Sequence, residues 1–147
     1  MRVTRELALA VAPELVWRAL WDVPRMVACV PGCVDAREVE PHRRYAARMS
    51  QRVGPIALSV PLDIRVTEPA PGHLALDARG RDGLLAAEVQ MSVRLAVEAA
   101  GAGSRLAVEA EGRVLGKLGA LGAGVIQRRA EELIDEFASR LRGAIGG

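Results

Sequence analysis

The side chains most suited to metal binding or nucleophilic chemistry are few in this sequence: Cys29, Cys33, His42 and His73. The cysteines form one C-x-x-x-C pair without any further cysteine, which is not enough for a usual four-ligand zinc site. Both histidines stand beside turn-forming residues, where a solvated loop position is a simpler interpretation than a catalytic base. We therefore predict no metal site here, and reduced cysteines.

Acidic residues near the C-terminus do not suggest an acid–base pair either. Glu131, Glu132, Asp135 and Glu136 alternate with apolar residues at helical spacing, so we expect them on the solvent side of a helix. A pair of catalytic carboxylates would instead need an apolar pocket around one member, and the pattern predicts none.

The positions predicted to face inward carry almost no reactive groups. Gln51 and the Tyr45 hydroxyl are the polar groups among them, whereas nucleophilic or acid–base catalysis needs two such groups within reach of each other. Only Trp17, Trp21, Tyr45 and Phe137 are aromatic, so Ala, Val and Gly leave volume that the layers must close. We predict an interior that binds an apolar ligand, with no catalytic residue: the protein is not an enzyme by itself.

The longest amphipathic segment, Leu118 to Arg142, is predicted to form one C-terminal helix. Its apolar residues recur three and four positions apart, and Arg128 and Arg129 belong to the opposite, charged arc. Gly143 stands where a C-cap glycine ends a helix. The apolar face consists of Leu118, Leu121, Val125, Ile126, Ala130, Leu133, Ile134, Phe137, Ala138 and Leu141.

Seven runs of alternating apolar and polar residues precede this helix, as is typical of half-buried strands. Two short segments of helical spacing, Pro13–Trp21 and Pro24–Val30, lie between the first two runs. Short connections imply antiparallel neighbours, so we predict an α+β fold in one domain, residues 1–147: a curved seven-stranded antiparallel sheet wrapped around the long C-terminal helix. The predicted strands are Val3–Val11, Val34–Val39, Tyr45–Val53, Ile56–Val66, Leu74–Ala78, Val89–Val97 and Leu106–Val114.

Charge and hydropathy exclude several classes of partner. The formal net charge is +2 and the basic residues form no long run, so nucleic acid is not expected as a partner. No apolar run approaches the length of a membrane span, and the N-terminus lacks the regions of a signal peptide. We expect a cytoplasmic protein.

Glycines 116, 119, 122 and 124 suggest two interpretations for the segment before the C-terminal helix. They could cradle a phosphate, but Lys117 is followed by Leu118 rather than Ser or Thr, and no strand comes after the helix. We favour close packing of the helix on the sheet, or a mobile cavity mouth.

Four stretches of the sequence resemble one family: PELVWRALWD, PRMVACVPGC, RVGPI and GRVLGKLGALG. Together with the order of the predicted elements, they resemble the family of the carbon monoxide dehydrogenase G-subunit, within the START/Bet v 1-like (SRPBCC) helix-grip superfamily. The resemblance covers nearly the whole chain. Its most specific part is the run Val30 to Cys33 after the Trp21-Asp22 pair.

This resemblance implies a hydrophobic cavity between sheet and helix, no chemistry of its own, and an accessory role beside the subunits of a molybdenum hydroxylase. The ligand it implies is an isoprenoid quinone or another long lipophile, whose affinity we expect to follow tail length. Two alternatives stay open: an assembly or recruitment factor without a ligand, and a helix-grip cyclase or hydrolase acting on a hydrophobic small molecule.

Relatives continue into a flexible tail that attaches to membrane, whereas this sequence ends at Gly147. We therefore expect at most transient contact with the inner face of the membrane. The sequence leaves the oligomeric state open, a homodimer included. We expect the ligand to contact Tyr45, Met49, Gln51, Leu58, Val60, Met91, Val93, Val125, Ile126 and Phe137, and the cavity mouth to comprise Met26, Val30, Pro31, Gly32, Gly119 and Gly122.

Overall fold

The computed structural model of the protein describes residues 1–83 and 87–145. Its strands form one antiparallel sheet in the order β1-β7-β6-β5-β4-β3-β2. The elements along the chain are β1 (Arg2–Leu9), α1 (Pro13–Trp21), α2 (Val23–Val27), β2 (Cys33–Glu40), β3 (Arg44–Val53), β4 (Ile56–Ala70), β5 (His73–Asp82), β6 (Ala87–Ala100), β7 (Gly103–Leu115), the 3-10 helix η1 (Gly116–Leu121) and α3 (Ala123–Ile145).

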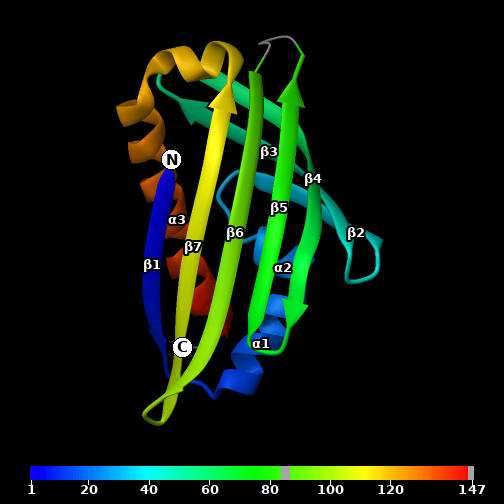
Figure 1. Ribbon diagram of the computed structural model, residues 1–147, viewed down its shortest axis with the longest axis vertical. Coiled ribbons are helices and arrows are strands. Elements are labelled where there is room, and N and C mark those ends of the chain that lie inside the picture. The colour runs from blue at the N-terminus through cyan, green and yellow to red at the C-terminus, as the bar shows by residue number, and fades with distance from the viewer. Residues whose placement is uncertain (84–86, 146–147) are drawn as a thin grey trace.

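The three α-helices lie on one face of this sheet (Figure 1). Alternation along each strand explains why: in β3, Tyr45, Ala47, Met49, Gln51 and Val53 are buried while the residues between them are more exposed. Helix α3 contacts β1 and β3, two strands that are far apart in the sheet order, so the sheet must curve around it. The predicted fold class is confirmed.

The predicted long helix is wrong at both ends. Gly122 has a φ of 93°, a conformation that glycine adopts without strain, and it separates η1 from α3. Leu118 therefore belongs to η1, and α3 begins at Ala123. Gly143 does not end the helix, which continues to Ile145.

Some strands are longer than the alternation predicted. β5 was expected to stop at Ala78 but continues through Gly80 to Asp82. Gly80 is closely packed, because a Cβ there would lie 2.9 Å from a methyl carbon of Leu62 on the neighbouring strand, which would have to shift.

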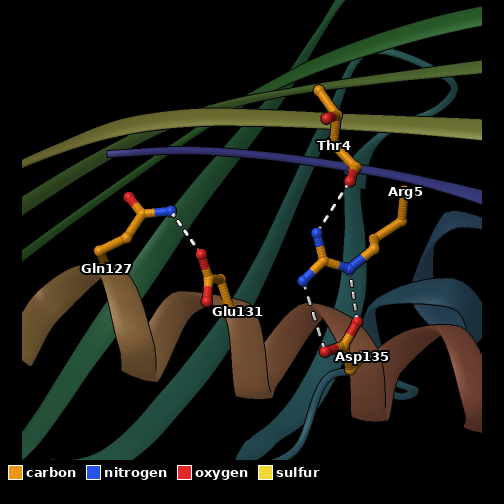
Figure 2. A network of polar contacts seen from close by, with 5 residues as sticks. All are labelled: Thr4, Arg5, Gln127, Glu131 and Asp135. Carbon is orange, nitrogen blue, oxygen red and sulfur yellow. Dashed lines mark hydrogen bonds and ion pairs between the residues drawn. The ribbon is translucent and has the colours of Figure 1, made fainter.

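Polar side chains of α3 attach this helix to the edge strand β1 (Figure 2). The Gln127 amide donates to the carbonyl of Arg2 at 2.9 Å and accepts from its backbone N–H at 3.3 Å, as a neighbouring strand would. Arg5 pairs with Asp135 at 2.7 Å and also donates to the carbonyl of Thr4. Backbone groups of Arg2 and Thr4 at the free edge of β1 are thus covered by side chains.

The other edge strand, β2, is protected by irregularity. Its pairing with β3 shifts register between Val34 and Arg37 and again between Glu38 and Glu40. Asp35 lies within the first shift and has a φ of 56°. Such bulges bend an edge strand and interrupt its row of free backbone groups.

Candidate functional site

An apolar cavity of about 190 Å³ lies between the inner face of the sheet and α3. Residues from α2, from all the strands except β1, from η1 and from α3 line it, and Met1 closes part of the wall. The lining residues are Met1, Met26, Val27, Val30, Cys33, Met49, Gln51, Val53, Leu58, Leu62, Ile64, Leu76, Ala78, Val89, Met91, Val93, Leu95, Val108, Ala110, Arg113, Val114, Leu118, Ile126, Arg129, Ala130, Leu133, Ile134 and Phe137.

Small side chains in the walls help to keep the space open. Ala78 and Ala110 on the sheet and Ala130 on α3 all line the cavity, where a leucine at any of them would project into it. Phe137 is the aromatic residue of the described lining, and the remaining apolar volume comes from aliphatic side chains and methionines. The composition that predicted an incompletely filled core is thus concentrated around this cavity.

The predicted ligand-contacting residues divide into two groups. Tyr45 and Val60 do not line the cavity; both are buried elsewhere in the core, at 2% and 0% exposure. Val125 lies outside it as well: its side chain is 36% exposed, whereas the next residue, Ile126, faces inward. The predicted residues that do line the cavity are Met49, Gln51, Leu58, Met91, Val93, Ile126 and Phe137.

The predicted mouth residues divide in the same way. Met26 and Val30 line the cavity, whereas Pro31, Gly32, Gly119 and Gly122 do not. Gly32 has a φ of 80°, and a Cβ there would overlap the carbonyl oxygen of Ser50, so its glycine is required by the turn itself. Gly119 packs against the Val114 carbonyl, where a Cβ would lie 3.0 Å away. Both glycines thus serve close backbone packing.

Gln51 and Arg129 form a polar cluster in the otherwise apolar wall. Gln51 is buried, and its Nε2 donates to the carbonyl of Pro31 while its Oε1 accepts from Arg129 Nη2 at 2.9 Å. Arg129 Nη1 donates to Glu132 Oε2 at 3.0 Å. Arg129 Nε is buried and has no hydrogen-bond partner among the residues that the structure describes.

Arg129 is one of the lining residues that sequence reasoning missed. It was assigned to the charged, solvent-facing arc of the helix together with Arg128, yet its side chain is 31% exposed and lines the cavity. A usable signal was its spacing, since it stands three residues after Ile126 and four before Leu133, both of which line the cavity.

The chemistry available in the cavity is limited. Cys33, Gln51, Arg113 and Arg129 are the lining residues with polar functional groups among those described, and none is a carboxylate or an imidazole. Burial raises the pKa of the Cys33 thiol to about 11, which keeps it protonated and a poor nucleophile at neutral pH. Within residues 1–83 and 87–145, no group of three His, Cys, Asp or Glu side chains could hold a metal ion.

Several solved structures share this architecture. Among solved structures, a conserved protein from Geobacillus kaustophilus superposes with a TM-score of 0.87 at 21% identity, covering 99% of this chain and 95% of that one. A START superfamily protein from Mycobacterium smegmatis gives a TM-score of 0.74 at 13% identity over 99% and 97% of the two chains. Ara h 8.0201 gives 0.65 at 14% identity, with the same coverage. These similarities establish the START/Bet v 1-like fold alone.

No curated protein matches the chain. None of the helices in the described part of the chain is both long and apolar enough to cross a membrane. The family model for the carbon monoxide dehydrogenase G-subunit (CoxG) matches residues 6–146 of the 147-residue sequence. The protein therefore belongs to the CoxG family, and it has the START/Bet v 1-like fold.

Proposed function

We propose that this protein is a non-catalytic accessory protein of a molybdenum hydroxylase of the carbon monoxide dehydrogenase type. We further propose that it binds a lipophile, specifically a quinone, in the cavity between the sheet and α3. The observation that carries the proposal is the cavity itself: apolar walls with no acid–base pair among the described lining residues. Membership of the CoxG family supports the choice of partner enzyme.

The cavity volume limits how much of the ligand is enclosed. A dry cavity of roughly 150 Å³ holds one benzene molecule, so about 190 Å³ accommodates a substituted ring or a short branched chain. Burying about 200 Å² of apolar ligand surface at roughly 25 cal/mol per Å² contributes about 5 kcal/mol before the costs of association. A long isoprenoid tail must extend beyond the cavity or displace α3, so affinity should rise over the first isoprene units and then level off.

Filling the cavity with a side chain tests where the ligand sits. Ala130→Phe projects a ring into the cavity from α3 and should weaken quinone binding at least tenfold, measured by titration calorimetry. Val125→Phe adds the same ring to an exposed position on the same helix and is the matched control, expected to bind as the wild type does. Equal affinities of the two variants would place the ligand elsewhere and refute the proposal.

Two further measurements address the identity of the ligand and the partner. Mass spectrometry of an organic extract of the purified protein should detect a quinone or a related lipophile. The purified molybdenum hydroxylase should bind the loaded protein and reduce the quinone it carries; no binding between the two proteins would remove the accessory role while leaving the ligand site intact.

A further inference from the structure

The polar cluster in the cavity wall places a charged donor group beside the apolar cavity. Arg129 uses Nη2 for Gln51 and Nη1 for Glu132, at 2.9 and 3.0 Å, whereas its buried Nε–H has no partner among the described residues. A buried donor without an acceptor destabilises a protein, which makes an acceptor supplied by a ligand energetically valuable. We infer that Arg129 Nε–H is the donor for a single neutral oxygen, such as a ketone, quinone or ester carbonyl, on a ligand bound in the cavity.

The surrounding contacts hold this donor in place. Gln51 is 7% exposed, and the Pro31 carbonyl fixes its amide, so that its Oε1 is turned toward the guanidinium. Glu132 holds the opposite side of the guanidinium from the next turn of α3. A donor fixed by two partners before the ligand arrives loses little conformational entropy on binding.

The same contacts disfavour a carboxylate ligand. A carboxylate prefers two parallel N–H donors from one guanidinium, and Gln51 already occupies Nη2 beside Nε. The Glu132 carboxylate lies 3.0 Å from Nη1, so a fatty acid would bring a second negative charge close to the first. Arg113, which also lines the cavity, is exposed, so solvent and salt screen its attraction for anions.

This inference rests on the proposed function, because it assigns ligand chemistry to the same cavity. Its test compares three probes that share one ring and four methyl groups: duroquinone, its oxygen-free counterpart durene, and the corresponding benzoate. Each is small enough to probe the cavity without a tail. Affinities are measured by titration calorimetry for the wild type, Arg129→Met and Arg128→Met, the last being an exposed control on the adjacent position.

We expect the wild type to bind duroquinone about tenfold more tightly than durene, the effect of one hydrogen bond to a charged donor. Arg129→Met should reduce this ratio to about one through loss of duroquinone affinity, while durene binding shows that the cavity is intact. Arg128→Met should keep the wild-type ratio. Gln51→Leu frees Nη2 beside Nε, and should increase the affinity for the benzoate relative to duroquinone.

Two results would overturn the inference without touching the proposed function. One is equal binding of duroquinone and durene by the wild type, which would mean that water satisfies Nε. The other is tighter binding of the benzoate than of duroquinone by the wild type. If none of the three probes binds the wild type, the proposed apolar site fails, and the assignment of Arg129 fails with it.

Discussion

Cys33 contributes its thiol to the wall of the cavity, where burial raises its pKa to about 11 from an ordinary value of 9.0. Cys29, four residues earlier in the sequence, is also buried, and burial raises its pKa as well. Both cysteines are free thiols. Because burial raises both pKa values, the free energy of unfolding should depend on pH in the alkaline range.

Replacing Cys33 by alanine should make the fold less sensitive to alkaline pH. As pH rises from about 9 to about 11, the unfolded chain loses the thiol proton before the folded one does, so the unfolded state binds fewer protons and the free energy of unfolding falls. The slope due to one such group is at most about 1.4 kcal/mol per pH unit. The free energy of unfolding, measured by urea denaturation at several pH values in this range, should fall less steeply with pH for Cys33→Ala than for the wild type. An unchanged dependence on pH would mean that burial does not raise the pKa of the Cys33 thiol.

Arg129 marks the limit of sequence reasoning at the scale of single residues. Alternation along strands identified the inward side of Met49, Gln51 and Leu58, because a strand has only two faces. A helix offers a continuous range of directions, so a long side chain at the border of the apolar face can turn either way. The partner that turns Arg129 inward, Gln51, is distant in sequence, and no local pattern records that contact.

At the scale of elements, the start of α3 depends on Gly122. The glycines in this region predicted either close packing or a mobile mouth, and the structure assigns them different backbone roles: Gly122 has a positive φ, while Gly124 lies in the first turn of α3 without one. Local sequence marked the segment as unusual. It could not place the break, because helical spacing continues across Gly122 on both sides.

Alanine substitutions at these two glycines should have opposite effects on stability. Gly122→Ala forces an L-residue to a φ of 93° and should lower the free energy of unfolding by roughly 1 kcal/mol or more. Gly124→Ala replaces a helical glycine with open space around its Cβ, and should raise stability by up to about 1 kcal/mol. Thermal unfolding of both variants measures the difference. A Gly122→Ala protein as stable as Gly124→Ala would show that the break between η1 and α3 is not a fixed feature.

At the scale of the whole molecule, most of the fold could be predicted because its layers follow from simple periodicities. Alternating apolar and polar residues predicted the strands, apolar residues three and four positions apart predicted the helix, and short connections predicted antiparallel pairing. The cavity was expected from composition, but its position and volume were not, because they depend on small residues from distant segments, such as Ala78, Ala110 and Ala130, lining the same space. That arrangement arises only when distant segments pack.

Ligand binding should stabilise the whole fold, because the unfolded chain has no cavity. A quinone present at roughly one hundred times its dissociation constant should add about 2.7 kcal/mol to the free energy of unfolding, which corresponds to roughly 5–10 °C in Tm. The Ala130→Phe protein, whose cavity is already occupied by a side chain, should show little shift. If both proteins gained equally, the lipophile would be binding to the surface.

The cover over β1 also decides how copies of this molecule can meet. Sheets join into open-ended stacks only when each copy offers two bare edges, and here Gln127 and Arg5 occupy backbone groups of Arg2 and Thr4 from within the same molecule. The β2 edge, with its register shifts around Asp35, is the less covered one. A contact built by strand addition at β2 alone would be two-fold and would end at two copies, whereas a strand added at β1 would first have to displace Gln127 from the backbone of Arg2.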